Sequence, residues 1–421
     1  MDPKPFLRTL FDRAVDAVSP GRVLPAHLPE PPNGCTVVLA VGKAATAMAE
    51  VVATHWQGPL TGLAVTRYGH ALPALRRHPN IELIEAGHPV PDENSVAGAR
   101  RALALARRLG ANDLALVLVS GGGSALWCLP IPQLRLEDKR RITSELLLAG
   151  ASIRELNTVR RALSQIKGGK LAEAAAPARV ETLIISDVVG DDPATIASGP
   201  TVPRRETVAD VEEVLRRYRI ELPAGALHAV NKESSPFTLR DDNRCRIVGA
   251  SADALSAAAE AARAAGCDVR VLSDAIEGDA REAAALHAAI AREVAQVGKP
   301  TVVLSGGEVT VTVRNRNGIG GPNTEFLLAL AIELKGAAGI HAIACDTDGY
   351  DGVGSNAGAL IGPETLQRAS AMGIDSIHAL ETNDSGRVLA ALGDLVVTGP
   401  TQTNVSDFRA ILVWGSRLGD G

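Results

Sequence analysis

Short runs of aliphatic and β-branched residues recur along this chain, and most of them end close to a Gly, Ser or Asp and lead into alanine-rich sequence. Strands of this length that alternate with helical stretches are typical of parallel α/β sheets. The alternation therefore predicts an α/β fold. The runs are TVVLAVG (36–42), GLAVTRYG (62–69), LALVLVS (114–120), TLIISDV (182–188), RIVGAS (246–251), DVRVLSD (268–274), TVVLSGG (301–307), HAIACDTDG (341–349) and LVVTGP (395–400).

The length of the chain predicts two domains. A single hydrophobic core stops growing at roughly 250 to 300 residues, and this chain has 421. The stretch 193–243 is rich in proline, charge and turn residues, which indicates a boundary near its end. We therefore expect a first α/β domain over 1–243 and a second over 244–421.

Composition argues against several classes of function. A net charge of -5 and an aromatic content of 3% do not suit a nucleic-acid binder, which needs a basic surface and stacking platforms. The most apolar stretch, 114–132, is interrupted by three glycines and two prolines, so no membrane span is expected. Charges within the first fifteen residues argue against a secretory signal, and the five scattered cysteines form no CxxC pair. Together these features favour the cytoplasm.

Two polar segments follow predicted strands, which is where open α/β sheets place ligands. Lys43 follows Gly42 and falls in the first turn of a predicted helix, whose free N–H groups attract anions. An exposed surface lysine accounts for this segment equally well. A second segment separates the run 114–120 from a helix, and its three glycines would let backbone N–H groups approach phosphate oxygens. A tight turn that needs glycine is the alternative. This segment consists of Ser120, Gly121, Gly122, Gly123 and Ser124.

A similar glycine segment ends the run 301–307, although another strand follows it, so a bulged hairpin is the alternative to a phosphate loop. Its residues are Ser305, Gly306, Gly307 and Glu308. Together with Asn323 further along the chain, they complete the predicted cofactor-binding set.

A helix is predicted to begin at Ser152, which forms a capping-box spacing with Glu155, and to stop at Gly168. Its buried stripe is Leu156, Val159, Leu163 and Ile166. A second stripe beside it consists of Asn157, Arg160, Ser164 and Lys167. Two cations with an amide and a hydroxyl suit a carboxylate or a phosphate, and Asn157, Arg160 and Lys167 are the predicted substrate-binding residues. A solvated rim is the alternative.

Two loops are rich in aspartate, which indicates a cation site or, alternatively, Asx turns and helix caps. The spacing does not match an EF-hand, whereas Mg²⁺ takes only one or two protein carboxylates and keeps waters and phosphates. The predicted metal ligands are Asp187, Asp191, Asp346, Asp348 and Asp351. His88 has no second histidine at metal spacing and is interpreted as structural.

Taken together, these segments resemble the glycerate 2-kinase family of the MOFRL type, whose members are sometimes labelled hydroxypyruvate reductases. The motifs that carry the resemblance are VGKAATAMA, GHPVPDENS, LVSGGGSALW, GASIRELNTVRRALSQIKGGKLA, ISDVVGDDPATIASGPT, LSGGEVTVTV, DTDGYDGVGSNAGA and GDLVVTGPTQTNVSDF. The resemblance implies an N-terminal Rossmann-like parallel-sheet domain and a C-terminal mixed α/β domain, with the active site in a cleft between them. It also implies ATP, Mg²⁺ and phosphorylation of the 2-hydroxyl of D-glycerate. The implied partners are these small molecules, with a homodimer left open.

By the same resemblance, Lys43 matches the proposed catalytic lysine of the family, and the segment Ser120 to Ser124 matches its phosphate-side loop. The sequence departs from the family where many members carry an arginine beside a glycine pair, because Ile319 and Pro322 stand here. That role is vacant or has moved to Arg314 or Arg316.

The resulting hypothesis is direct in-line transfer of the γ-phosphoryl group, with Lys43 on the phosphate and one aspartate as the proton acceptor. Asp187 and Asp348 are the candidates for that aspartate. The rival is an NAD(P)H-dependent hydroxypyruvate reductase, which would need a GxGxxG turn where VGKAATA has one glycine. A sugar-acid-binding regulator is a third, non-enzymatic possibility.

Overall fold

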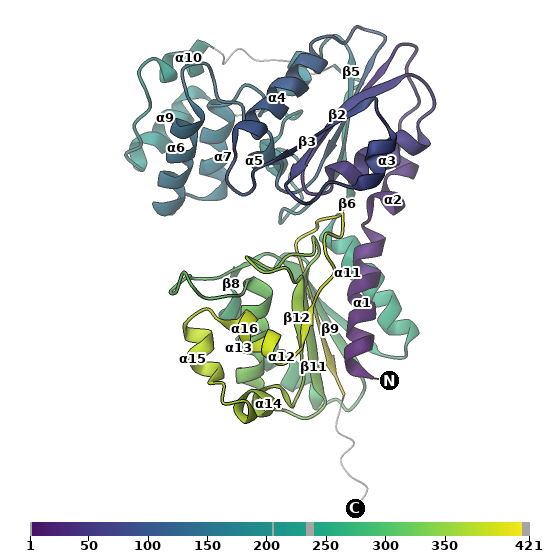
Figure 1. Cartoon of the computed structure of the whole chain (residues 1–421), viewed down its shortest axis with the longest axis vertical. Coiled ribbons are helices and arrows are strands. Elements are labelled where there is room, and N and C mark those ends of the chain that lie inside the picture. The colour runs from purple at the N-terminus through teal and green to yellow at the C-terminus, as the bar shows by residue number, and fades with distance from the viewer. Residues whose placement is uncertain (1, 204–205, 233–239, 415–421) are drawn as a thin grey trace, which may run out of the picture. The chain divides into compact units, whose positions relative to one another are not determined.

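The computed structural model describes residues 2–203, 206–232 and 240–414, which form two compact units (Figure 1). The N-terminal unit spans 20–248, and the C-terminal unit combines the described residues up to 19 with those from 249 onward. This division differs from the expected one at 243/244, because the first helix belongs with the second unit. The later cut falls near the end of a strand, five residues from the expected position.

A six-stranded sheet forms the centre of the N-terminal unit. Its order is β3-β2-β1-β4-β5-β6, and the pairs β3–β2, β2–β1, β1–β4 and β4–β5 are parallel. This is the strand order of a Rossmann fold, so the expectation of a Rossmann-like domain is confirmed. The strands are β1 (Thr36–Val41), β2 (Leu60–Arg67), β3 (Ile81–Ala86), β4 (Leu114–Val119), β5 (Arg179–Ile185) and β6 (Arg244–Gly249).

Two groups of helices accompany this sheet (Figure 1). Every residue of β1 and β4 is buried, as expected for parallel strands that are covered on both faces. The helices nearest the sheet are α2 (Pro20–Val23), α3 (Ala45–His55), α4 (Glu93–Ala106), α5 (Gly123–Leu126) and α8 (Lys170–Ala175). A separate apolar cluster joins α6 (Leu136–Leu148), α7 (Ile153–Ala162), α9 (Val208–Arg217) and α10 (Ala226–Lys232).

Helix α7 is shorter than predicted. Ser152 and Glu155 do form the predicted capping box at its start, but the helix ends at Ala162 instead of continuing to Gly168. Ser164 forms a β-bridge with Pro130, and the Gln165 N–H donates to the Leu129 carbonyl oxygen at 2.9 Å. These bonds replace the helical ones, so the predicted polar stripe is split between a helix and a loop.

The C-terminal unit contains a mixed sheet in the order β13-β12-β11-β14-β9-β7. Only β7 and β9 pair in parallel among the described pairs of this sheet; the other four are antiparallel. The strands are β7 (Asp268–Ser273), β9 (Thr301–Gly307), β11 (Ile340–Asp346), β12 (Gly358–Ile361), β13 (Leu395–Val396) and β14 (Asp407–Val413). The short strands β8 (Gly278–Asp279) and β10 (Val309–Thr310) form a separate parallel pair. The expected mixed α/β second domain is confirmed.

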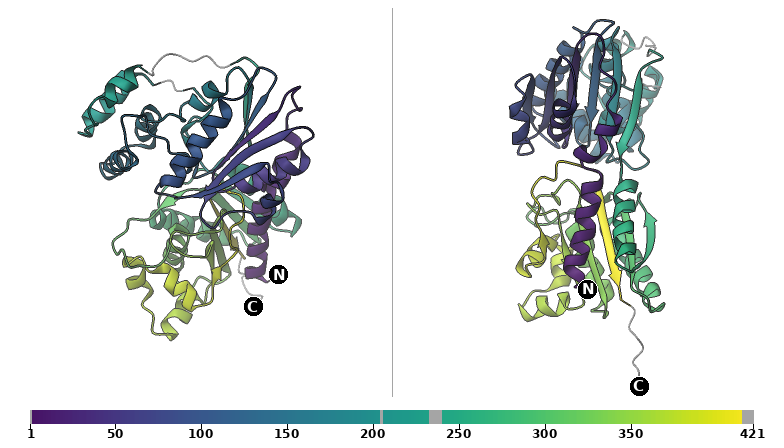
Figure 2. Two further views of the ribbon diagram at one scale, coloured as in Figure 1. Left: turned by 45° about the horizontal axis from the view of Figure 1, so that its top comes forward. Right: turned by 90° about the vertical axis from the view of Figure 1, so that its right-hand side faces the viewer.

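Helix α1 (Pro3–Ala17) lies alongside β14, as the right-hand view of Figure 2 shows. Its buried residues Leu7, Leu10, Phe11 and Ala14 recur at helical spacing, and the rings of Phe11 and Phe408 are 5.9 Å apart. This apolar face explains why the N-terminus belongs to the C-terminal unit. The other helices of this unit are α11 (Ser251–Ala264), α12 (Ala280–Ala295), α13 (Pro322–Leu334), α14 (Thr365–Ala371), α15 (Ser376–Glu381) and α16 (Ser385–Ala391).

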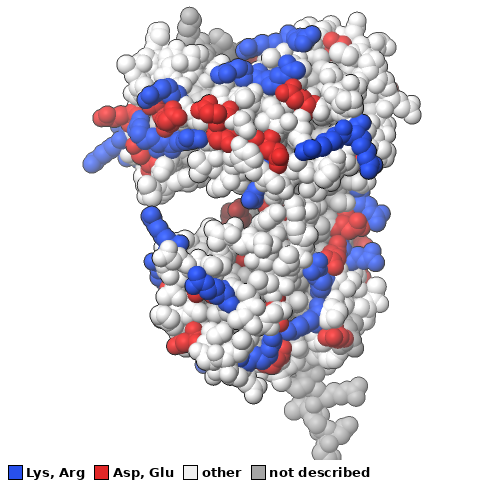
Figure 3. Space-filling view, in the orientation of Figure 1, with Lys and Arg blue, Asp and Glu red and all other residues white. Residues whose placement is uncertain are grey.

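The surface carries charges of both signs. In Figure 3, lysine and arginine side chains are interspersed with aspartate and glutamate on the visible face of each unit. Among the described residues, no helix is long and apolar enough to cross a membrane.

Candidate active site

The turns that follow β1 and β4 meet at one point of the N-terminal sheet. These strands are neighbours, and the chain order reverses between them, which is the position where Rossmann-type sheets bind ligands. The Lys43 N–H donates to the Gly121 carbonyl oxygen at 2.8 Å, and the Ala44 N–H donates to Ser120 Oγ at 3.0 Å. Lys43 and the segment Ser120 to Ser124, which we call the glycine loop, are therefore held together.

Glycine is required at two positions of these turns. Gly42 has φ +124°, and a Cβ atom there would lie 2.2 Å from Ser120 Oγ. Gly122 has φ +82° and precedes α5, and a Cβ atom there would lie 3.0 Å from Nε2 of His88 and 3.5 Å from Cγ of Lys43. A side chain at Gly122 would intrude between these two groups, so the glycine also keeps the approach to Lys43 open.

A cavity of about 530 Å³ opens beside the glycine loop. Four cationic side chains line it, namely Lys139 and Arg140 of α6, Arg160 of α7, and Lys167. Gly122, Ser124 and His88 also line it, and none of the described lining residues is an aspartate or a glutamate. We call this space the cation cavity. Its size suits a small-molecule site, and its charge suits an anion.

Burial disfavours the charged form of the two lysines in the cation cavity. Lys167 is 1% exposed, and its ammonium donates to the Ser124 carbonyl oxygen at 2.8 Å. Burial, followed by repulsion from Lys139, holds the pKa of Lys167 well below its usual value. Burial likewise lowers the pKa of Lys139 to about 8, and it lowers the pKa of Arg160. A bound anion would offset the free-energy cost that burial and mutual repulsion impose on the charged forms of these side chains.

The predicted substrate-binding residues do not all reach this cavity. Arg160 and Lys167 line it, whereas Asn157 does not. The Asn157 Oδ1 atom accepts a hydrogen bond from Ser198 Oγ at 3.1 Å, and Ser198 Oγ lies 2.7 Å from Ser124 Oγ. Asn157 therefore supports the glycine loop through Ser198, because α7 turns its side chain away from the cavity.

Sequence reasoning missed three residues of the cation cavity. The sequence indicates a structural role for His88, yet its ring lies against Gly122. Lys139 and Arg140 belong to the charged segment LEDKRR, which looks like an exposed helix face. Helical periodicity could have identified Lys139, because it lies on the buried face of α6 with Leu136, Ile142 and Leu146.

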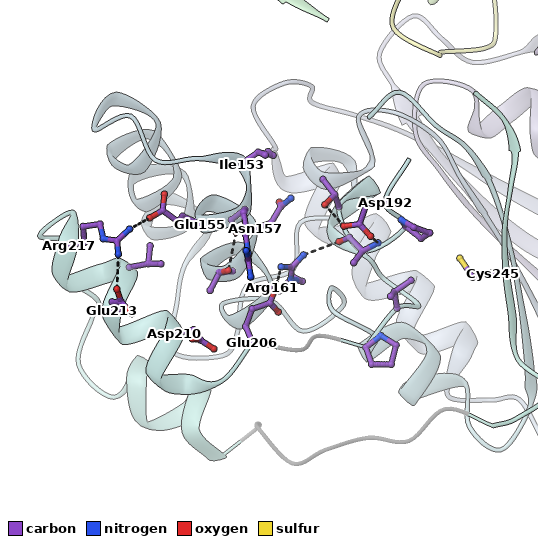
Figure 4. Close-up of a pocket in the computed structure, with 18 residues that line it drawn as sticks. Ile153, Glu155, Asn157, Arg161, Asp192, Glu206, Asp210, Glu213, Arg217 and Cys245 are labelled. Carbon is purple, nitrogen blue, oxygen red and sulfur yellow. Dashed lines mark hydrogen bonds and ion pairs between the residues drawn. The ribbon is translucent and has the colours of Figure 1, made fainter. Parts of the chain in front are cut away.

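A larger pocket of about 810 Å³ is also lined by α7, and two of its arginines are paired with carboxylates (Figure 4). Arg161 pairs with Glu206 and donates to the Ala194 carbonyl oxygen at 3.0 Å. Arg217 pairs with Glu155 at 2.6 Å and with Glu213 at 2.7 Å. Carboxylates also line this pocket, so it offers an anion less than the cation cavity does.

The predicted metal ligands are divided between the two units. Asp187 follows β5 and is half-buried, and Asp191 has φ +51°. In the C-terminal unit, Oδ1 of Asp346 accepts from the Asp348 N–H at 2.9 Å, and Oδ1 of Asp348 accepts from the Tyr350 N–H at 2.8 Å. Both arrangements are Asx turns. Within residues 2–203, 206–232 and 240–414, no group of three or more His, Cys, Asp or Glu side chains is arranged to hold a metal ion.

Asp351 caps the N-terminus of α13. Its two carboxylate oxygens accept from the N–H groups of Asn323 at 2.8 Å and Thr324 at 2.9 Å. Burial raises the pKa of Asp351 to about 6, although these N–H groups oppose the shift. The Asn323 amide also donates to Asp407 Oδ1 at 2.7 Å, and among the described residues its own Oδ1 has no hydrogen-bond partner. Asp351 and Asn323 thus have structural contacts within this unit.

The second predicted phosphate loop, Ser305 to Glu308, begins with a buried residue. Ser305 is buried, and its Oγ lies 2.8 Å from Nε2 of His287. The Gly306 carbonyl oxygen accepts from the buried Arg409 at 3.2 Å. Glu308 is exposed, and β10 then pairs with β8, so the segment is not a hairpin.

The segment that lacks the family arginine leads into α13. Ile319 is 42% exposed, and Pro322 is the first residue of the helix. Arg314 and Arg316 are both exposed.

The fold and the cation cavity define an α/β protein with a cation-lined cavity beside the switch point of a Rossmann-type sheet. Comparison with known proteins agrees with this class. Residues 6–231 match a family described as a domain of unknown function (DUF4147), and residues 301–407 match the MOFRL family. A solved structure of glycerate kinase from Thermotoga maritima superposes with a TM-score of 0.88 at 37% identity, covering 97% of this chain and 99% of that one.

Two curated relatives illustrate the names within this family. "D-glycerate 2-kinase" of Thermotoga maritima is 38% identical over 94% of this chain and 95% of its own length. "Putative hydroxypyruvate reductase" of Agrobacterium vitis is 50% identical over 97% of this chain and 94% of its own length. This chain belongs to the glycerate kinase family of the MOFRL type.

Proposed function

We propose that this protein is a kinase that transfers the γ-phosphoryl group of ATP to the 2-hydroxyl of D-glycerate, giving 2-phospho-D-glycerate. The glycerate kinases among its relatives support the acceptor. The observation that carries the proposal is the cation cavity beside the glycine loop, because the substrate is a small carboxylate and the transferred group is a phosphate.

The chemistry would rest on positioning and charge neutralisation. Arg160 and Lys167 would hold the carboxylate of D-glycerate, and Lys43 with the N–H groups of the glycine loop would hold the γ-phosphoryl group of ATP up to and during its transfer. The 2-hydroxyl oxygen forms the new bond to phosphorus while the bond to the β-phosphate oxygen breaks and ADP departs.

An aspartate would accept the proton of the 2-hydroxyl. Asp187 is favoured over Asp348, because it follows β5, the strand next to β4 in the sheet that carries the glycine loop. Asp348 instead accepts a backbone N–H in a turn of the other unit. A matched pair of variants, Asp187→Asn and Asp348→Asn, tests this choice, since only the loss of the base should lower kcat at saturating substrates.

A Mg²⁺ ion that travels with ATP would offset the charge of the phosphates and needs only one or two protein carboxylates. Asp187, Asp191, Asp346 and Asp348 remain candidates for this contact, whereas both oxygens of Asp351 already accept N–H groups from α13. Ser305, Gly306, Gly307, Glu308 and Asn323 remain nucleotide-binding candidates with weaker support, because Ser305 and Asn323 are hydrogen-bonded inside the C-terminal unit.

The rival reaction is reduction of hydroxypyruvate by NAD(P)H, as some names in the family suggest. A dinucleotide turn needs three glycines so that the backbone can approach the pyrophosphate. The turn after β1 offers Gly42 followed by Lys43, Ala44 and Ala45, so it does not supply that approach.

The decisive assay offers the purified protein D-glycerate with ATP and Mg²⁺, and separately hydroxypyruvate with NADH or NADPH. We expect ADP release that depends on D-glycerate, and ³¹P NMR should show phosphate on carbon 2. Oxidation of the nicotinamide without ADP release would refute the kinase. Phosphate on carbon 3 would refute only the position of transfer.

A further inference from the structure

We propose that the cation cavity holds two anionic groups at once, the carboxylate and the phosphoryl group of a 2-phosphorylated hydroxy acid, with Lys139 and Arg140 of α6 as specificity residues for that product. The inference rests on the proposed function, since it concerns the same site. It predicts that the cavity binds the phosphorylated acid more tightly than the hydroxy acid itself.

The first argument is a balance of charge. Lys139, Arg140, Arg160 and Lys167 all line the cavity without a lining carboxylate among the described residues. D-glycerate brings a single negative charge, so even its pairing with Arg160 and Lys167 leaves no negative charge for Lys139 and Arg140. Buried charges are costly unless they are paired, so two further cations at the same cavity indicate a ligand with more negative charge. A carboxylate with an adjacent phosphate meets that requirement.

The second argument is how α6 presents its two cations. The Arg140 Nε donates to the Pro91 carbonyl oxygen at 2.7 Å, which fixes the guanidinium plane at the cavity wall and makes it a rigid fork suited to phosphate. The Lys139 ammonium, 5% exposed, lies 3.3 Å from the Leu163 carbonyl oxygen and 3.5 Å from that of Arg160. These contacts hold its charge at the cavity.

Those carbonyl contacts also allow a purely structural role, in which Lys139 caps the end of α7. The substitution Lys139→Gln separates the two roles, because glutamine keeps N–H donors for the carbonyl oxygens but removes the charge. Arg140→Gln does the same at the neighbouring position. Arg141→Gln is a matched control, since Arg141 pairs with Glu145 at 2.9 Å and does not line the cavity.

The experiment measures binding by calorimetry at pH 7 without nucleotide, using 2-phospho-D-glycerate, D-glycerate and inorganic phosphate as separate ligands. We expect the phosphorylated acid to bind the unaltered protein at least about tenfold more tightly than D-glycerate. Lys139→Gln and Arg140→Gln should each weaken the phosphorylated acid by about tenfold while changing D-glycerate by less than about threefold. Arg141→Gln should change neither affinity.

Equal affinities for the two acids, or an equal loss of both in Lys139→Gln, would overturn the inference. A thermal melt of each variant confirms that it is folded, and Arg140→Gln keeps the test open if Lys139→Gln does not fold. Failure of the proposed function has a different signature. Tight binding of the phosphorylated acid without phosphorylation of D-glycerate would support the cavity assignment and refute the proposed reaction. An active kinase that binds both acids equally would refute only the cavity assignment.

Discussion

Replacing Lys139 by glutamine should change how the stability of the ligand-free protein depends on pH. Burial is the main cause that lowers the pKa of this lysine from 10.5 to about 8, and nearby Arg160 and Lys170 lower it further, while Cys128 opposes them. Each pH unit by which a pKa moves corresponds to about 1.4 kcal/mol. Holding Lys139 protonated in the folded state at pH 7 therefore costs about 3 to 4 kcal/mol.

The direction of the effect follows from proton binding. Between pH 8 and 10.5 the unfolded chain keeps the Lys139 proton while the folded chain has lost it, so the free energy of unfolding rises with pH. Below pH 8 both states bind the proton, and the whole cost is present. The stability advantage of Lys139→Gln over the unaltered protein should therefore shrink by about 2 to 3 kcal/mol between pH 7 and pH 10.

Urea denaturation of both proteins at pH 7, 8, 9 and 10 measures this difference, and a constant change in packing or hydrogen bonding cancels from it. Arg141→Gln serves as the control, because Arg141 lies on the same helix but pairs with Glu145 at 2.9 Å and does not line the cavity. Parallel stability profiles for the unaltered protein and Lys139→Gln would refute the reasoning, since they would mean that the lysine is not desolvated in the cavity.

Three further substitutions test other parts of the site. Lys43→Met should lower turnover by about 100-fold or more with little change in stability, because Lys43 would act on charge that develops during transfer; near-normal steady-state turnover would remove this assignment. Gly122→Ala should lower the free energy of unfolding by about 1 to 2 kcal/mol, since its φ is +82° and the new methyl group would press on the His88 ring; an unchanged urea midpoint would contradict the loop geometry. Asp351→Ala should lower the free energy of unfolding by about 1 to 2 kcal/mol, because it removes the cap of α13. Circular dichroism during urea unfolding measures this loss, and an unchanged urea midpoint would contradict the capping role.

The strands that are continuous apolar runs were predictable from sequence. β1, β4 and β9 lie within predicted segments, and β9 coincides with its segment. Three strands of the two main sheets lie outside the predicted runs. β3 (IELIEA) has alternating acids that weaken the apolar signal, β12 (GALI) is only four residues long, and β14 (DFRAILV) follows a polar segment and contains a buried Arg409. The packing of α1 against the C-terminal unit was not predictable either, since the apolar stripe of the helix does not reveal which of the two sheets it covers.

The candidate site was predictable only in part. Strand ends identified Lys43 and the glycine loop, because the carboxyl ends of neighbouring parallel strands meet at one edge. Lys139 and Arg140 could not be assigned in that way, since α6 packs beside the sheet and its place depends on tertiary contacts. The predicted end of α7 was wrong, because Ser164 forms a β-bridge with Pro130, a residue distant in sequence, and the helix stops before it.

The central claim is that the hydroxy acid binds in the cation cavity of the N-terminal unit. A crystal structure of the protein with D-glycerate and a non-hydrolysable ATP analogue tests it most directly. We predict that the carboxylate of D-glycerate lies within hydrogen-bonding distance of Arg160 or Lys167, with its 2-hydroxyl turned toward the glycine loop. Bound D-glycerate outside this cavity, with Arg160 and Lys167 contacting no part of it, would contradict the account.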